Sequence, residues 1–216
     1  MGPGEYSMEL DPRRFHPSRK AYRYTVLAFS SLMLFGSYFA YDSVGAIENT
    51  LMEVFHTDRS SIGAMYSMYS VAAFFSVLLG GFLIDRIGTR RASMLFSVLV
   101  AAGASIVAVA PSLLAFYLGR ILFGIGGESL AVAQVAIVAR WFTGKELALS
   151  FGIAVTVSRL GTFFTFNTMA LLAARLGFRG SLWVAAALCG FGLLANWVYA
   201  VLDRHAQPIL GRRTRR

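Results

Sequence analysis

Long apolar runs recur along nearly the whole chain, and each is long enough to cross a lipid bilayer as a helix. The six runs cover about residues 25–47, 60–84, 92–110, 112–139, 148–173 and 182–202. About 20 helical residues span a hydrocarbon core of about 30 Å, because each residue adds about 1.5 Å. The composition agrees, since 56% of the residues are hydrophobic, 14% are charged and the mean hydropathy is +0.61. The sequence therefore predicts an all-α membrane protein with six transmembrane helices.

The basic residues predict how these helices are oriented. If the helices alternate in direction, fifteen of the 20 Lys and Arg residues fall on one side of the membrane. These are Arg13, Arg14, Arg19, Lys20, Arg23, Arg86, Arg90, Arg91, Arg140, Lys145, Arg204, Arg212, Arg213, Arg215 and Arg216. Because cytoplasmic segments are enriched in Lys and Arg, we expect cytoplasmic basic tails over 1–24 and 203–216 and a six-helix transmembrane domain over 25–202. Basic tails at an anionic leaflet need no nucleic acid, so no nucleic-acid partner is expected.

No catalytic or metal-binding constellation stands out in the sequence. The three histidines, His16, His56 and His205, fall in tails or loops, and Cys189 is the single cysteine. Neither a set of nucleophile, base and acid nor a metal-ligand spacing is visible. We therefore expect no enzyme, no cofactor and no metal site.

The most specific local pattern is GGFLIDRIGTRR, residues 80–91, between the second and third predicted helices. Its loop-signature or gating residues are Gly81, Asp85, Arg86, Gly88, Arg90 and Arg91. Gly88 permits a tight turn, and the Asp85 carboxylate can accept hydrogen bonds from neighbouring helix ends and basic groups. A plain positive-inside loop is the alternative interpretation. The pattern and its position resemble the loop signature of the major facilitator superfamily.

Other segments resemble one branch of this superfamily, the lysosomal dipeptide uniporters. They read FGSYFAYDSVGA (35–46), GRILFGIGGESLAVAQ (119–134), RWFTGKELALSFG (140–152) and SRLGTFFTFN (158–167). The resemblance covers only the amino-terminal half of such a transporter, here six helices in a 3+3 pseudo-repeat. It implies twelve helices in the whole protein, with substrate bound between two six-helix halves. We therefore expect a fragment or a half-transporter that needs a second half, either its own missing half or another copy.

Glu128 places a carboxylate in the middle of the fourth apolar run. Glu128 lies twelve residues before Arg140, which marks the cytoplasmic end of the fourth run. Arg159 lies twelve residues after Leu147, which marks the cytoplasmic start of the fifth run. Both residues are therefore about 18 Å into the membrane, near its midplane. Because an isolated charge there costs about 2.5–3.5 kcal/mol or more, both should face the bundle interior or a wet cavity.

Three roles are open for these two charges. They could clasp a zwitterion, with Glu128 binding an ammonium and Arg159 binding a carboxylate through its planar fork. They could instead form an ion pair that only ties two helices together. Glu128 could also couple transport to protons. The branch resemblance implies the first role, with a dipeptide as the small zwitterionic substrate.

Further polar residues within the helices are candidates for the same site. Tyr38, Tyr41 and Asp42 share one helical face through their i, i+3, i+4 spacing, with aromatic packing as the alternative for the tyrosines. Asn167 is either a substrate contact or an interhelical hydrogen-bonding group. Arg120 lies about 30 Å from the cytoplasmic end, which suits gating or helix bracing better than substrate contact.

Together these features predict a secondary-active or facilitative transporter that moves dipeptides or similar small zwitterions by alternating access. One alternative is a proton-coupled transporter of organic anions or drugs. Another is a non-transporting membrane subunit that stabilises a partner. The expected partners are the lipid bilayer, the substrate, the second six-helix half and an accessory membrane protein. The resemblance implies the lysosomal membrane in a eukaryote and the cell (inner) membrane in a bacterium.

Overall fold

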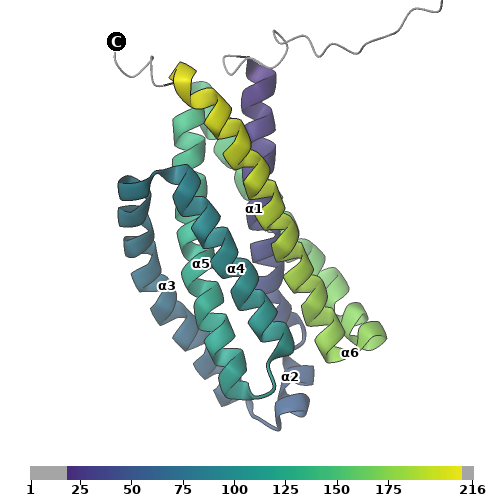
Figure 1. Ribbon diagram of the computed structural model, residues 1–216. Coiled ribbons are helices and arrows are strands. Elements are labelled where there is room, and N and C mark those ends of the chain that lie inside the picture. Colours follow the sequence, from purple (N-terminus) through teal and green to yellow (C-terminus); the bar gives the residue numbers. More distant parts are fainter. Residues whose placement is uncertain (1–18, 211–216) are drawn as a thin grey trace, which may run out of the picture.

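Six helices make up the part of the chain that the computed structural model describes, residues 19–210. They are α1 (Lys20–Ala46), α2 (Glu48–Phe55), α3 (Arg59–Ile87), α4 (Thr89–Val109), α5 (Leu113–Trp141) and α6 (Lys145–Leu210). Figure 1 shows one bundle, with both ends of the described chain at the same end of it. Parts of both predicted basic tails lie outside the described residues, including Arg13, Arg14, Arg212, Arg213, Arg215 and Arg216.

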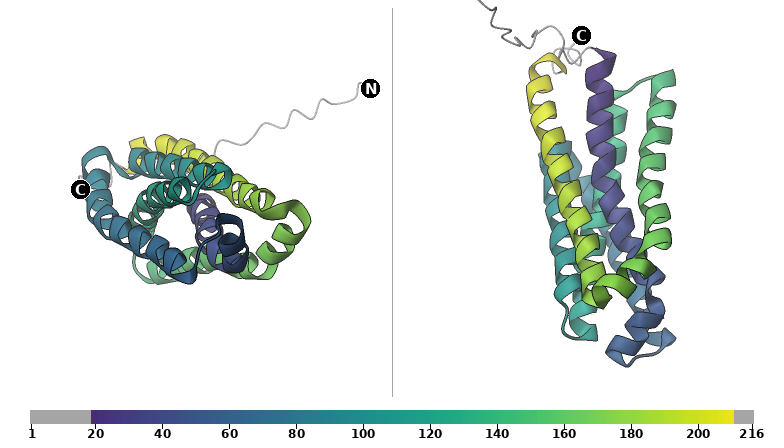
Figure 2. Two further views of the ribbon diagram at one scale, coloured as in Figure 1. Left: turned by 90° about the horizontal axis from the view of Figure 1, so that it is seen from below. Right: turned by 90° about the vertical axis from the view of Figure 1, so that its right-hand side faces the viewer.

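Within the described residues, five of the helices, all except α2, are long and apolar enough to cross a membrane. The all-helical membrane architecture is therefore confirmed. Helix α6 has 66 residues, which at the helical rise is about 99 Å and far more than one bilayer crossing requires. At Gly177 the backbone leaves the helical region (φ 74°, ψ 171°). The chain turns back there, so α6 consists of a first arm before Gly177 and a second arm after it (Figure 2).

Glycines let α1 pack closely against both arms of α6. A Cβ atom at Gly36 of α1 would lie 2.2 Å from the carbonyl oxygen of Leu188 on the second arm. A Cβ atom at Gly161 of the first arm would lie 2.3 Å from the carbonyl oxygen of Phe35. A larger residue at either position therefore forces the two backbones apart. On the other side of the bundle, α3 and α4 pack against α5.

The connections between helices are short because the helix ends carry suitable residues. Gly88, with φ 83°, is the single residue between α3 and α4, and glycine takes up this conformation without strain. Asp58 caps α3, since its carboxylate accepts hydrogen bonds from the Ser61 amide at 2.9 Å and the Ser61 hydroxyl at 2.8 Å. These bonds hold the pKa of Asp58 below its ordinary value.

Residues 48–55, which lie between the first two predicted apolar runs, form helix α2. Leu51 of this short helix is fully buried. Phe55 packs edge-on against Phe116 of α5 and Phe178 of α6, with ring centroids 5.7 and 5.8 Å apart. The apolar runs do not indicate this helix, because tertiary contacts stabilise a helix that is too short to be stable alone.

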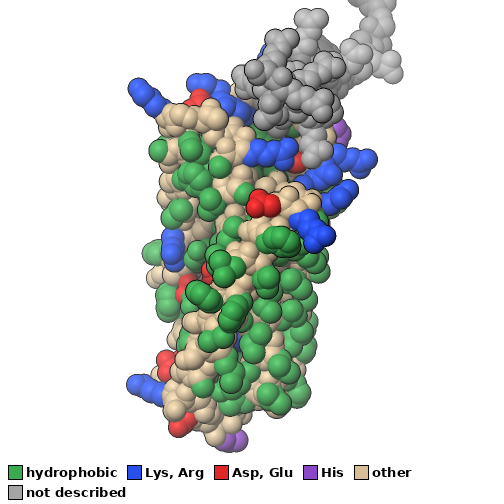
Figure 3. All heavy atoms as spheres, turned by 90° about the vertical axis from the view of Figure 1, so that its left-hand side faces the viewer, with side chains coloured by type: hydrophobic (Ala, Val, Ile, Leu, Met, Phe, Trp, Pro, Cys, Tyr) green, Lys and Arg blue, Asp and Glu red, His purple; other side chains and the backbone are tan. Residues whose placement is uncertain are grey.

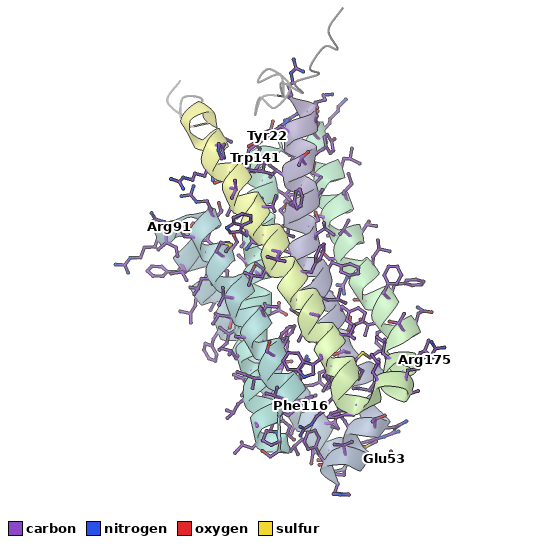
Figure 4. All side chains as sticks on the ribbon, turned by 45° about the vertical axis from the view of Figure 1, so that its right-hand side comes forward. Tyr22, Glu53, Arg91, Phe116, Trp141 and Arg175 are labelled. Atoms are coloured by element: carbon purple, nitrogen blue, oxygen red, sulfur yellow. The ribbon has the colours of Figure 1, made fainter. Side chains whose placement is uncertain are left out.

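Lys and Arg side chains gather at the end of the bundle where the described chain begins and ends, and hydrophobic side chains cover the sides (Figure 3). Figure 4 places Tyr22, Arg91 and Trp141 toward that end and Glu53, Phe116 and Arg175 at the opposite end. The charge asymmetry expected from the sequence is therefore visible in the three-dimensional arrangement.

Contacts between helices close the basic end of the bundle. Trp141 of α5 is buried and stacks on Tyr22 of α1, with ring centroids 5.9 Å apart. Arg140 forms an ion pair with the buried Asp203 at 3.3 Å, which joins α5 to the second arm of α6. Glu146, at the start of the first arm, pairs with Arg23 of α1 at 2.5 Å. An ion pair thus joins each arm of α6 to a neighbouring helix.

Candidate functional site

A cavity of about 270 Å³ lies where α1, α3, α5 and the first arm of α6 meet. It is lined by Ser37, Tyr38, Tyr41, Tyr69, Gly127, Glu128, Ala131 and Arg159. Two of these residues are charged and four carry hydroxyl groups. The cavity therefore brings together four of the six residues that the sequence suggested for substrate binding, namely Tyr38, Tyr41, Glu128 and Arg159.

The Glu128 carboxylate is held from a neighbouring helix. The Tyr69 hydroxyl of α3 donates a hydrogen bond to Glu128 Oε1 at 2.9 Å. Space for the Tyr69 ring comes from Gly124 of α5, where a Cβ atom would lie 2.8 Å from the ring. Gly127, one residue before Glu128, also lines the cavity. The glycine-rich sequence of α5 therefore makes room for the tyrosine that binds the acid.

Arg159 lies on the first arm of α6, and its guanidinium carbon is 4.8 Å from the centre of the Tyr38 ring. A cation over a ring face is attracted by the ring quadrupole, which orients the side chain. Within residues 19–210, no ion pair of 4.0 Å or less joins Arg159 to Glu128. The cavity thus contains an acid and a base that do not neutralise each other by direct contact.

Arg120 of α5 is 2% exposed and lies behind the cavity wall. Its guanidinium carbon is 5.3, 5.2 and 5.3 Å from the ring centres of Tyr41, Tyr69 and Phe123. One nitrogen donates a hydrogen bond to the carbonyl oxygen of Ala40 on α1 at 3.3 Å. This side chain therefore joins α1, α3 and α5. Two of the rings that it contacts, those of Tyr41 and Tyr69, line the cavity.

Two other predicted binding residues do not line this cavity. Asp42 is half-buried, and its Oδ2 atom has no hydrogen-bond partner among the described residues. Asn167 is exposed, and its amide donates to the carbonyl oxygen of Phe163 in its own helix at 2.7 Å. Asn167 lies eight residues after Arg159 on the same helix, about 12 Å further along its axis, which separates it from the cavity. A role for either residue stays a prediction.

The loop-signature residues lie at the basic end, away from the cavity. Gly88 forms the turn, Gly81 lies on α3, and Asp85, Arg86 and Arg91 are exposed, whereas Arg90 is half-buried. Within the described residues, the Asp85 carboxylate makes no hydrogen bond or ion pair, although the sequence suggested several partners for it. Asp85 is exposed on α3, and the main packing of this helix is toward α5.

Sequence reasoning missed Tyr69. It lies in the segment MYSMYSVAAFF, where aromatic and apolar residues are expected to pack or to face lipid, so nothing in α3 alone marks it. The usable signal is on the partner helix, since Gly124 leaves room for a large side chain from a neighbour.

The class of protein that this fold and this cavity define is a helical membrane transporter. The Major Facilitator Superfamily model matches residues 29–215, and the chain belongs to this family. The resemblance expected from the loop signature and the glycine-rich segment is thereby confirmed. Membership in a transporter family also confirms the prediction that the chain is not an enzyme.

Two curated relatives show how far the similarity extends. The mouse (Mus musculus) lysosomal dipeptide transporter MFSD1 is 39% identical over 208 residues, covering 90% of this chain and 45% of the relative. The human (Homo sapiens) protein of the same name is 36% identical over 213 residues, covering 92% of this chain and 46% of the relative. The chain spans less than half the length of these relatives.

Solved structures of peptide transporters share the fold. The crystal structure of the peptide transporter POT in complex with alafosfalin superimposes with a TM-score of 0.72 at 23% identity, over 80% of this chain and 37% of that chain. The POT family transporter PepTSo gives a TM-score of 0.70 at 16% identity, over the same shares of the two chains. At these identities the likeness establishes the fold.

Proposed function

We propose that the chain forms the amino-terminal six-helix half of a transporter that moves dipeptides or similar small zwitterions by alternating access. The observation that carries this proposal is that Glu128 and Arg159 line one cavity without pairing with each other. A carboxylate suits a substrate ammonium, and a guanidinium fork suits a substrate carboxylate. The names of the relatives, lysosomal dipeptide transporters, support the same substrate class.

The size of the cavity is compatible with such a substrate. A sphere of the 270 Å³ volume is about 8 Å across, and two residues of an extended chain span about 7 Å. Binding pockets for small molecules have volumes of about 300–1,000 Å³. The cavity is thus large enough for the two charged ends of a dipeptide, and a second six-helix half, from another copy or another part of a longer protein, would complete its wall.

We further propose that α1, α3, α4 and α5 each span the membrane once and that the two arms of α6 add two more spans, in a 3+3 pseudo-repeat. The turn at Gly177 supports this count, because it divides α6 into two lengths that each suffice for one crossing. The names of the relatives support a lysosomal membrane. An accessory membrane protein is a further proposed partner.

Dipeptide counterflow into liposomes that contain the purified chain tests the proposed function. We expect labelled dipeptide to exchange in the absence of a pH gradient, and a dipeptide with an acetylated amine to exchange much less. Accumulation only when a pH gradient is present would contradict uniport and favour the proton-coupled alternative. Failure to exchange or accumulate, by protein that is folded in the same liposomes, would contradict transport by copies of this chain alone, and failure that persists when a second six-helix half is supplied would favour the non-transporting subunit.

The proposed topology makes a separate prediction about cysteine labelling from outside intact cells in which the chain is directed to the plasma membrane, where the lumenal face becomes the outer face. Glu53→Cys, at the end opposite the described termini, is expected to react with a membrane-impermeant maleimide, whereas Ser7→Cys and Thr214→Cys in the two tails are not. The native Cys189 is buried and supplies no background. Labelling of both tails without permeabilisation would overturn the cytoplasmic placement.

A further inference from the structure

We infer that Tyr69 is a positioning residue that orients Glu128 toward the amine of the substrate, and that the buried Arg120 fixes Tyr69 for this task. The inference rests on the proposed function, and it adds Tyr69, which lines the cavity, and Arg120, which does not, to the residues that contact the substrate.

The first step is the single hydrogen bond that the Glu128 side chain makes within the described residues. Its Oε1 atom accepts from the Tyr69 hydroxyl at 2.9 Å. A carboxylate has two oxygens and about four lone-pair sites, so Oε2 stays available on the cavity side. A side chain held through one oxygen presents the other in a defined direction, which reduces the entropy that binding must remove.

The second step is how firmly Tyr69 itself is held. Tyr69 is 5% exposed, and its ring is 4.9 Å from the ring of Tyr41 and 6.5 Å from that of Phe123, measured between centroids. The absence of a side chain at Gly124 lets the ring pack directly against α5. Because the ring is buried and packs against α1 and α5, the hydroxyl has little freedom to leave Glu128.

The third step is the charge behind this ring. The Arg120 guanidinium contacts the rings of Tyr41, Tyr69 and Phe123 at 5.2–5.3 Å, while its Nε and Nη2 atoms have no hydrogen-bond partner within the described residues. Ring faces therefore supply most of its direct contacts, an arrangement that suits a planar, delocalised cation.

This arrangement predicts an effect at one end of the substrate only. Loss of the Tyr69 hydroxyl leaves Glu128 in place but free to rotate, so substrates with a free amine should bind less tightly. A substrate with an acetylated amine does not use Glu128 and should be unaffected. A residue that served only packing would affect both substrates alike.

The test compares Tyr69→Phe with the matched control Tyr66→Phe, one helical turn earlier on α3. Tyr66 is half-buried and does not line the cavity. The probes are alanyl-alanine, its carboxyl amide and N-acetyl-alanyl-alanine, with affinities measured by calorimetry on the purified chain in detergent. For Tyr69→Phe we expect about tenfold weaker binding of alanyl-alanine and of the amide, and a change of less than about twofold for the acetylated probe. Tyr66→Phe should change none of the three.

Arg120→Lys provides a second, independent variant. A lysine keeps the charge, but a compact ammonium cannot lie flat against three rings. We expect the same preferential loss of probes with a free amine, accompanied by a lower unfolding temperature.

Equal losses for all three probes, or equal losses in the Tyr69 and Tyr66 variants, would overturn the positioning role and leave the proposed function intact. A parent protein that binds no alanyl-alanine at all would instead overturn the proposed function, and the inference with it. Unchanged binding of every probe by folded Tyr69→Phe would contradict the inference directly.

Discussion

Replacing Gly36 by alanine is expected to destabilise the bundle by about 2 kcal/mol or more. The new Cβ atom would lie 2.2 Å from the carbonyl oxygen of Leu188, and backbone atoms cannot move aside as a flexible side chain does. Overpacking of this kind costs about 3 kcal/mol, whereas alanine gains about 1 kcal/mol over glycine in helix propensity. The steric cost therefore exceeds the gain, and the unfolding temperature in detergent should fall by several degrees.

Gly190→Ala is the matched control for this prediction, because it makes the same chemical change in the second arm of α6. Apart from the backbone of its own helix turn, no atom lies within 4 Å of the position that its Cβ would occupy. The control should be neutral or slightly stabilising, since only the helix propensity changes. Equal unfolding temperatures for the two variants would show that α1 does not pack against α6 as closely as the structure has it.

Arg159→Lys is expected to weaken binding of a free dipeptide by tenfold or more. The guanidinium can form two parallel hydrogen bonds to a carboxylate, and a lysine ammonium cannot reproduce that fork. Lysine would also lose the planar contact with the Tyr38 ring, which now lies 4.8 Å from the guanidinium carbon. Calorimetry with alanyl-alanine and with its carboxyl amide measures the effect.

The amide serves as the control, because it lacks the carboxylate that Arg159 is proposed to bind. Its affinity should fall much less in the Arg159→Lys variant than the affinity of the free dipeptide. A parallel loss for both ligands would assign Arg159 to folding or to the shape of the cavity instead.

Much of the fold could be predicted because lipid imposes a simple length rule. The apolar run 60–84 corresponds to α3 (Arg59–Ile87), and 112–139 corresponds to α5 (Leu113–Trp141), with ends that differ by one to three residues. The glycine expected to turn the chain at Gly88 does so with φ 83°. Helix α2 was not predicted, since its contacts with α5 and α6 are not visible in its own eight residues.

The site could be predicted in part, for a physical reason. Helical rise gives the depth of a residue, and Glu128 and Arg159, placed at equal depth by counting residues, line one cavity. Rise alone does not give the direction of a side chain in the assembled bundle. Asn167 was therefore predicted as a substrate-binding residue, but its side chain hydrogen-bonds within its own helix. Tyr69 was not predicted, but its hydroxyl donates a hydrogen bond to Glu128.

The central claim is that Glu128 and Arg159 hold the two ends of a zwitterion and do not only brace each other. Thermal unfolding in detergent, with and without alanyl-alanine, tests it on four proteins: the parent, Glu128→Gln, Arg159→Gln and the double variant. Because no direct ion pair joins the two side chains, each single change should shift the ligand-free unfolding temperature by less than about 3 °C. The parent should gain stability from the dipeptide, and the double variant should not.

A purely bracing role for Glu128 and Arg159 would give a different pattern of unfolding temperatures. If the two charges were a brace, each single change would leave one buried charge unpaired and lower the unfolding temperature strongly, and the double change would restore much of the loss. A double variant that is stable and still gains as much stability from alanyl-alanine as the parent does would contradict the proposed substrate site.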